Sequence, residues 1–320
     1  MKITRLKGGS LSSTCLHESP DISFVRKSVS TVKDREYGFV RWYSQLKKLQ
    51  RYQTLFPGLV PRILNVGYDA DTAYFDLEYL ADYQDIKTIL SSDWVTQADI
   101  KNINTALWSA FNVLHSNGYT ANPGAGALYY KEEVLQKLID ANTVNEFREF
   151  YNLDSYLYNG KNVPGIQRHL NSLEEFFRNL NLSSEEYTHG NPTLENTMYS
   201  LSENRIVFID LYEESIVDSK FLDYSQVLQC SRSLYGYVND RQVIVEGNSV
   251  SHNLTIPTSF GEFNQLFEQG IDPKDRATVD IFEATQFIRM LPFKCFAGDI
   301  NKAKFFYVHA CYLLDKILGQ

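Results

Sequence analysis

The stretch from His189 to Asn196 carries polar side chains whose order and spacing suit phosphoryl transfer. It reads His-Gly-Asn-Pro-Thr-Leu-Glu-Asn, and a short apolar run ending at Asp210 comes after it. In that reaction one side chain orients the acceptor hydroxyl, and side-chain oxygens hold a Mg²⁺ ion that bridges the phosphates. His189 and Asn191 are therefore the candidate catalytic residues. Asn196 and Asp210 are the candidate metal ligands. The alternative is a polar turn before an edge hairpin, because short motifs also occur by chance.

Two segments near the N-terminus could bind the phosphates of a nucleotide. Small residues, which would let backbone N–H groups approach phosphates closely, form a turn between two strand-like stretches: Gly8, Gly9, Ser10 and Ser12. Lys27 ends the third strand-like stretch, where a lysine could pair with the α- and β-phosphates. The alternatives are a plain hairpin turn and an exposed edge-strand lysine.

Lys27 would need a partner on the helix that follows it. Glu36 could form an ion pair, but it stands near the start of that helix. Gln45 lies in the middle of the helix and would hydrogen-bond Lys27 without neutralising its charge. The spacing leaves both partners open.

The strand that ends at Leu80 runs into the helical part of the chain. Kinases hold adenine through main-chain N–H and C=O groups of such a connection, so the main chains of Glu78 and Leu80 are candidates for that contact. Taken alone, the segment is only the end of a strand.

An acidic run follows Asp210 and contains Glu213, Glu214 and Asp218. These carboxylates could bind a cationic acceptor or position a sugar hydroxyl. Acidic runs of this kind more often form solvated loops, and we favour that interpretation for Glu213, Glu214 and Asp218.

The elements that must position these residues change in kind at residue 80. Before it, short strands and one helix follow the order β-β-β-α-β-β, typical of a small antiparallel sheet. The predicted strands cover 3–7, 14–17, 22–27, 62–68 and 73–79, and the predicted helix covers 34–52. The helix has an apolar stripe that contains Phe39, Trp42, Tyr43, Leu46 and Leu49.

After Leu80 the strands largely stop and helical periods dominate. Thr96 and Asp99 form a capping box before an apolar stripe, and Asn117-Gly118 gives that helix a left-handed end. Residues 119–130 are predicted as a loop, and 240–260 as a loop or small hairpin. Helical segments are expected at 131–182, 220–236, 261–269, 276–291 and 301–318, and two short strands at 197–201 and 205–210. The fold class is therefore α+β.

In this order the segments resemble the aminoglycoside phosphotransferase/choline kinase superfamily, whose loop usually reads HGD-x-x-x-x-N with a later I-D. The resemblance covers most of the chain, although 119–185 and 240–275 contribute little to it. It implies a bilobal protein-kinase-like fold, with a β-rich N-lobe at residues 1–80 and a helical C-lobe at 81–320. Three segments suggest the branch found in bacterial capsule and surface-polysaccharide loci: Gly8–Ser10 leading to Val25–Lys27, Leu222–Gln229, and Arg289–Pro292.

The resemblance also implies roles for single residues. Lys27 would hold the α- and β-phosphates of ATP, and Asn196 and Asp210 would bind Mg²⁺. Residue 191 would be the catalytic base. Asp223 matches an aspartate that supports the loop in the choline-kinase group, although it could simply cap the helix that it begins.

Asn191 departs from this pattern, because an amide cannot accept a proton at neutral pH. General-base assistance is typically worth about 10²–10⁴ in rate. Three explanations stay open: an engineered substitution, a natural pseudokinase, and an enzyme that uses another base. We favour the first, because every other catalytic position holds a competent residue type. We expect transfer of the ATP γ-phosphate to a hydroxyl of a small metabolite, a sugar or an amino alcohol. The alternative is a non-catalytic nucleotide-binding scaffold.

Composition limits the other partners. The net charge of −8 disfavours nucleic acid and anionic membrane surfaces as main partners. The four cysteines suit neither a disulfide framework nor a zinc site, and the N-terminus carries no signal peptide, so a cytoplasmic location is expected. His115 and His169 fall in helical stretches and are expected to be structural. The oligomeric state is not indicated.

Overall fold

The chain forms two compact units in a computed structural model. The structure describes residues 1–6, 12–33, 38–69, 71–120, 123–180, 183–212 and 215–319. Unit 1 contains residues 1–114 and 189–215, and unit 2 contains 115–188 and 216–320. Six residues that were singled out from the sequence lie outside the described residues: Gly8, Gly9, Ser10, Glu36, Glu213 and Glu214. The predicted first lobe, residues 1–80, falls within unit 1, and its boundary after residue 80 stays a prediction.

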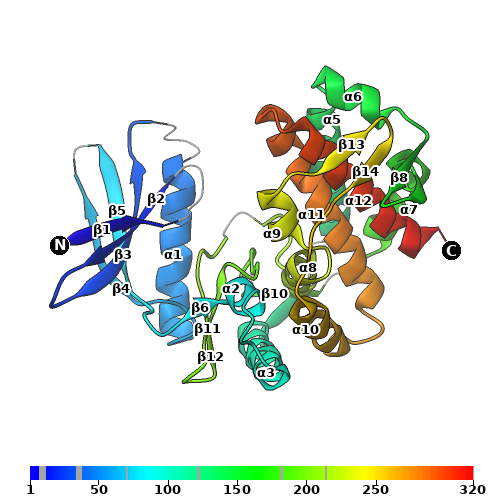
Figure 1. Ribbon diagram of the computed structural model, residues 1–320. Coiled ribbons are helices and arrows are strands. Elements are labelled where there is room, and N and C mark those ends of the chain that lie inside the picture. Colours follow the sequence, from blue (N-terminus) through cyan, green and yellow to red (C-terminus); the bar gives the residue numbers. More distant parts are fainter. Residues whose placement is uncertain are drawn as a thin grey trace. The chain divides into compact units, whose positions relative to one another are not determined.

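Unit 1 is built on a five-stranded antiparallel sheet with one helix against it (Figure 1). The strands are β1 (Lys2–Arg5), β2 (Ser13–Glu18), β3 (Ser23–Ser30), β4 (Ile63–Tyr68) and β5 (Thr72–Glu78). They lie in the order β1-β2-β3-β5-β4, and the helix α1, Val40–Leu55, falls between β3 and β4 in the chain. The predicted antiparallel arrangement and the order β-β-β-α-β-β are confirmed.

Helix α1 buries an apolar face. Trp42, Leu46 and Leu49 are all buried, and the Trp42 ring stacks on Phe75 of β5 with 5.4 Å between ring centroids. Burial of each such side chain stabilises the unit by roughly 1.5–3 kcal/mol. Tyr43 was predicted in the same stripe, but its side chain is 41% exposed. The stripe is therefore narrower than predicted, because position 43 lies about 100° around the helix from Trp42.

Helix α3, Gln97–Leu114, begins as predicted. The Asp99 carboxylate accepts hydrogen bonds from the N–H and hydroxyl of Thr96, and the N–H of Asp99 donates to the Thr96 hydroxyl. The predicted stripe is buried throughout: Ile100, Ile103, Leu107, Phe111 and Leu114. The predicted left-handed end was wrong. The helix stops at Leu114, and Gly118 instead begins strand β7, Gly118–Thr120.

A second, three-stranded sheet completes unit 1 and carries the chain to Asp210. Its order is β12-β11-β6, with bounds β6 (Gln84–Asp85), β11 (Thr197–Ser200) and β12 (Arg205–Phe208). The short helix α2, Ile86–Leu90, follows β6. The predicted hairpin is therefore present, although both of its strands are shorter than predicted. The buried ring of Phe208 stacks on Phe111 of α3 with centroids 5.5 Å apart.

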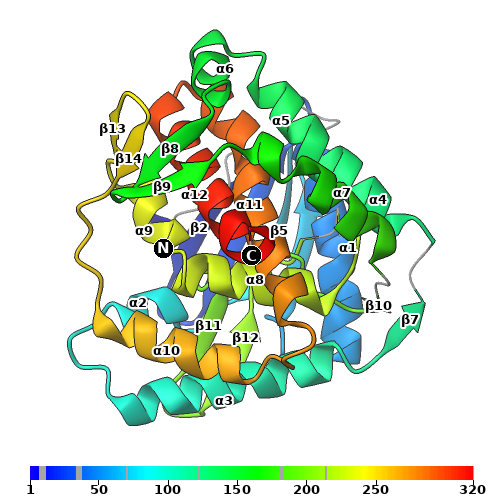
Figure 2. The ribbon, with the colours of Figure 1, turned by 90° about the vertical axis from the view of Figure 1, so that its right-hand side faces the viewer.

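Unit 2 is mainly helical. Its α-helices are α4 (Ala125–Tyr129), α5 (Gln136–Ala141), α6 (Asn145–Tyr151), α7 (Leu170–Asn179), α8 (Lys220–Ser231), α9 (Tyr235–Asp240), α10 (Thr258–Gln269), α11 (Arg276–Phe296) and α12 (Ile300–Leu318). A π-helix covers Tyr130–Leu135 and a 3₁₀ turn covers Ile166–Arg168. The buried α11 packs against α12, α8 and α5, and Figure 2 shows α11 and α12 side by side.

Strands also occur in unit 2, although few were predicted after residue 80. A four-stranded sheet has the order β13-β14-β8-β9 and a two-stranded sheet pairs β7 with β10. The bounds are β8 (Ser155–Tyr158), β9 (Lys161–Pro164), β10 (Ser183–Glu185), β13 (Ile244–Glu246) and β14 (Ser249–Ser251). These strands have three or four residues each, too few for an alternating pattern to be recognised. Across the described residues, no helix combines the length and apolar character needed to cross a membrane.

His309 on α12 is a buried titratable side chain of unit 2. Its ring is buried between Phe287 and Phe305, and its Nδ1 lies 2.7 Å from the hydroxyl of Tyr158. Burial, together with the positive charge of Arg232, lowers the pKa of His309 to about 3. A depressed histidine pKa gives stability that is present above about pH 6.5 and is lost as the pH falls towards 3.

We therefore expect unit 2 to lose about 2 kcal/mol of unfolding free energy through this one group between pH 7 and pH 5. Urea unfolding at pH 7, 6 and 5 measures it. His309→Asn keeps a hydrogen-bonding atom near Tyr158 but does not titrate in this range. This variant should be less stable at pH 7 and show a flatter pH dependence. An equally steep loss in both proteins would rule out His309 as the source.

Candidate functional site

Lys27 and Asp210 form an ion pair in unit 1, although 183 residues separate them. The Nζ atom of Lys27 lies 2.8 Å from Oδ1 of Asp210. The Lys27 side chain is 12% exposed and that of Asp210 is 43% exposed, so one side of the carboxylate is open to solvent. Both residues were singled out from the sequence for a phosphate and its metal ion. The structure brings them into direct contact.

The sheet decides which way Lys27 points. Side chains alternate along a strand, so Lys27 and its register partner Phe75 share one face, while Arg26 and its partner Asp76 share the other. Arg26 binds the buried Asp76 carboxylate through two nitrogens, at 2.7 and 2.8 Å. This hydrogen-bonded carboxylate raises the pKa of Arg26. The Arg26 charge is thus used within the sheet, and that of Lys27 faces Asp210.

Asp210 follows strand β12 in an uncommon backbone conformation. Its φ angle is +53°, in the left-handed region that few residues other than glycine adopt. Aspartate and asparagine tolerate that region best among the other residues, because their short polar side chains can hydrogen-bond locally. The left-handed residue turns the chain at the point where the carboxylate meets Lys27. Strain of this kind is concentrated at functional sites.

The loop from His189 to Asn196 is ordered by its own hydrogen bonds. Nδ1 of the fully buried His189 accepts from the N–H of Asn191 at 3.1 Å. The carbonyl of Asn191 accepts from the N–H of Thr193 at 2.8 Å and from Nδ2 of Asn196 at 3.0 Å. The Asn196 carbonyl accepts from the N–H of Ile209 at 3.0 Å. These contacts place Asn196 beside the residue that precedes Asp210. The His189 ring stabilises the conformation of the loop.

Gly190 allows the loop to approach the segment after Asp210. Its φ angle is +82°, and a Cβ atom at this position would lie 2.8 Å from the Tyr212 carbonyl oxygen. The N–H of Tyr212 donates to the carbonyl of His189 at 2.9 Å. A side chain at 190 would meet backbone that cannot move without breaking this bond.

Helix α1 contacts the site through polar side chains. The indole N–H of Trp42 donates to the carbonyl of Lys27 at 3.3 Å, and Nε2 of Gln45 donates to the carbonyl of Leu211 at 2.9 Å. Gln45, one of the two partners predicted for Lys27, is instead bonded through its amide nitrogen to the residue after Asp210. Lys48, which was not predicted at the site, donates to the Tyr212 carbonyl. The available signal was a lysine beside Leu49, at the edge of the apolar stripe.

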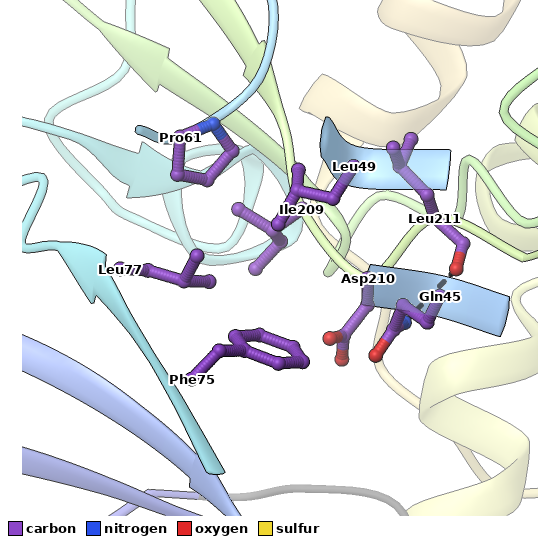
Figure 3. Close-up of a pocket in the computed structure, with 8 residues that line it drawn as sticks. All are labelled: Gln45, Leu49, Pro61, Phe75, Leu77, Ile209, Asp210 and Leu211. Atoms are coloured by element: carbon purple, nitrogen blue, oxygen red, sulfur yellow. Dashed lines mark hydrogen bonds between the residues drawn. The ribbon is translucent and has the colours of Figure 1, made fainter. Parts of the chain in front are cut away.

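A small pocket lies where α1, β5 and the segment around Asp210 meet (Figure 3). Figure 3 shows Phe75 and Leu77 of β5 on one side and the polar groups of Gln45 and Asp210 on another. Its free volume is about 10 Å³, roughly the space for one water molecule. Side chains therefore fill this side of the site, and the pocket is too small for a nucleotide base.

The two residues predicted to contact adenine, Glu78 and Leu80, lie at the end of β5 and just after it. The N–H of Glu78 donates to the carbonyl of Arg62, and the Glu78 carboxylate is bound to the Arg62 side chain at 2.7 Å. The carbonyl of Leu80 accepts from the N–H of Tyr83 at 3.2 Å. Glu78 also pairs with Phe24 of β3 as the last residue of β5, and Leu80 lies two residues after that strand. Ser12 lies in a half-buried bend before β2.

The donor set suits Mg²⁺ better than a transition metal. Within the described ranges no three or more His, Cys, Asp or Glu side chains are grouped to hold a metal ion. Asp210 offers a half-exposed carboxylate, and Asn196, whose nitrogen is bonded to Asn191, offers an amide oxygen. Mg²⁺ is commonly bound by one or two protein oxygens, with phosphates and water completing its six ligands. These two residues fit that requirement.

Asp223 lies in unit 2, at the start of α8. Its fully buried carboxylate lies 2.9 Å from Nε2 of His115, which is also buried. Ser219 caps the helix by accepting the N–H of Phe221, so the alternative in which Asp223 caps it was wrong. His169, 2% exposed, has its Nε2 3.5 Å from Asp315.

No family model matches this chain, and no curated protein sequence matches it.

Proposed function

We propose that this protein is an ATP-dependent phosphotransferase that moves the γ-phosphate to a hydroxyl of a small metabolite. The ion pair between Lys27 and Asp210 carries the proposal. Two residues far apart in the sequence, each expected at a phosphate or its metal ion, meet at 2.8 Å on the face of the sheet that Lys27 shares with Phe75. The proposal includes a bilobal kinase-like fold, with the N-lobe at 1–80 and the C-lobe at 81–320.

The chain's own residues would divide the work as follows. Lys27 would bind the α- and β-phosphates, and the carbonyl of Glu78 and the N–H of Leu80 would hold the adenine. Asp210 and Asn196 would hold Mg²⁺, which when bound neutralises charge on the β- and γ-phosphates. Residue 191 would orient the acceptor hydroxyl. The acceptor class we propose is a sugar or an amino alcohol.

Isothermal titration with a non-hydrolysable ATP analogue and Mg²⁺ tests the nucleotide half of the proposal. We expect binding below millimolar concentration, and a loss of roughly tenfold or more in Lys27→Met, since a hydrogen bond to a charged group is worth about 1.5–3 kcal/mol. Lys33→Met, at an exposed lysine a few residues after β3, is the matched control and should bind as the unaltered chain does. No binding at millimolar nucleotide would end the proposal.

A second candidate function rests on Asn191. The main chain of this residue is used to order the loop, and its side chain is an amide that cannot take a proton. A nucleotide-binding scaffold without turnover would need the loop and the metal ligands but not the base. This candidate predicts tight nucleotide binding with no phosphate transfer to any acceptor.

A further inference from the structure

Three side chains on one face of helix α1 reach the segments that form the candidate site. Trp42, Gln45 and Lys48 are spaced by three, which places them near one another along the helix. Trp42 donates to the strand that carries Lys27, and Gln45 donates to the residue that follows Asp210. The third contact, made by Lys48, joins two separate segments.

The ammonium group of Lys48 lies at the junction of the loop and the segment after Asp210. It donates to the carbonyl of Tyr212, and it lies 3.5 Å from the carbonyl of His189. The N–H of Tyr212 donates to that same His189 carbonyl at 2.9 Å. Lys48 therefore brings a charged donor to the place where the backbone bond from Tyr212 to His189 joins the two segments.

Burial makes this contact strong. Lys48 is only 7% exposed, and its ammonium lies 5.4 Å from the ring centroid of Tyr52. A buried ammonium has lost much of its hydration, so its hydrogen bonds must replace it. Hydrogen bonds from a charged donor are about twice as strong as neutral ones. The carbonyls of Tyr212 and His189 are thus held where the Lys48 side chain requires them.

We propose that Lys48 is a positioning residue that sets the arrangement of Asn191 relative to Asp210. Asn191 lies two residues after His189, and Asp210 lies two residues before Tyr212. One ammonium group therefore contacts both segments. In each segment the contact lies two residues from a residue that is expected to take part in the chemistry. The predicted effect of Lys48 on nucleotide binding rests on the proposed function. Its predicted effect on the loop does not.

Amide hydrogen exchange without nucleotide tests the positioning directly. Lys48→Met keeps the length of the side chain but removes its charge and donors, and it should speed exchange of the Tyr212 N–H by roughly ten- to a hundredfold. Lys47→Met is the matched control, because Lys47 is exposed on the same helix, and it should leave that exchange unchanged. Unchanged protection at Tyr212 in Lys48→Met would overturn the inference.

Titration with the ATP analogue and Mg²⁺ tests the consequence for the site. Lys48→Met should weaken binding by about tenfold, the effect of one lost charged hydrogen bond. Lys48→Arg, which keeps the charge and N–H donors, should recover most of the affinity. Faster exchange with unchanged affinity would show that Lys48 supports only the fold. If the unaltered chain binds no nucleotide, the proposed function fails, and the exchange result still decides the position of the loop.

Lys48 is buried, so a second variant is measured beside the first. Lys48→Gln keeps a neutral donor on a shorter side chain. If Lys48→Met loses its cooperative unfolding transition, Lys48→Gln decides. Faster exchange at Tyr212 in a folded Lys48→Gln supports the positioning role, and wild-type protection there contradicts it.

Discussion

Asn191→Asp is expected to raise phosphate transfer by about 10²–10⁴, the usual worth of a general base. Aspartate has nearly the same shape as asparagine and can accept the proton of the acceptor hydroxyl at neutral pH. The loop should keep its form, because the contacts at residue 191 are made by its main chain: its N–H to His189 and its carbonyl to Thr193 and Asn196. The effect is therefore expected in the rate rather than in stability.

ADP release measured against a panel of sugars, choline-like amines and aminoglycosides detects this gain. Asn191→Leu is the control, since it has a similar size and no acid or base group, and it should stay at the baseline. If Asn191→Asp transfers no phosphate to any acceptor while it binds ATP tightly, the scaffold function is the better account of the chain. A gain equal in both variants would assign the effect to loop packing.

Asp210→Asn is expected to weaken Mg²⁺-dependent nucleotide binding by more than about a hundredfold, because residues that merely support a metal ligand already contribute 10–100-fold. Asparagine removes the charge and keeps a side chain that tolerates the φ of +53°. Alanine at this position would add backbone strain of roughly 1–2 kcal/mol to the loss of charge. Asn196→Ala should weaken binding less, because Asn196 offers a neutral oxygen. Calorimetric titration with and without Mg²⁺ separates these effects.

Melting curves test the alternative explanation, in which Asp210 stabilises the hairpin and binds no metal ion. The Asp210 side chain of the ion pair is 43% exposed, and pairs that are open to solvent contribute about 0–1 kcal/mol. Asp210→Asn without ligand should therefore lower the melting temperature by only about 2–4 °C. A large drop without ligand, joined to an unchanged rise on adding Mg·ATP, would show that Asp210 holds the hairpin and no metal ion.

Local patterns in the sequence predicted the elements that carry the site. The five strands and α1 follow from alternation and helical spacing, and the Thr96–Asp99 cap follows from two residue types three apart. Lys27 and Asp210 could each be selected, because a strand lysine and an aspartate after an apolar run are local features. Their ion pair could not, because nothing local encodes a contact across 183 residues.

The elements that were missed depend on distant partners. Strand β8 pairs in parallel with β14, which lies more than ninety residues later, and each strand is too short to show a period. Gly118 was expected to end a helix, but it pairs with Glu185 in a sheet. Lys48 faces two backbone carbonyls. Every residue carries a carbonyl, so the sequence does not show which of them a lysine will contact. Whether a lysine is buried depends on which segments the fold packs around it.

The close approach at Gly190 has a consequence for how chains of this kind diverge. Any other residue at 190 would meet both an unfavourable backbone angle and the Tyr212 carbonyl, whether or not the loop performs chemistry. Selection for a folded loop alone would therefore preserve this glycine, and His189, whose ring accepts the Asn191 N–H, would be preserved with it. A lineage that lost catalysis would drift first at residue 191, where only the side chain carries the chemistry. The His-Gly pair alone is therefore no sign of catalysis, and under the proposed function that sign lies at residue 191.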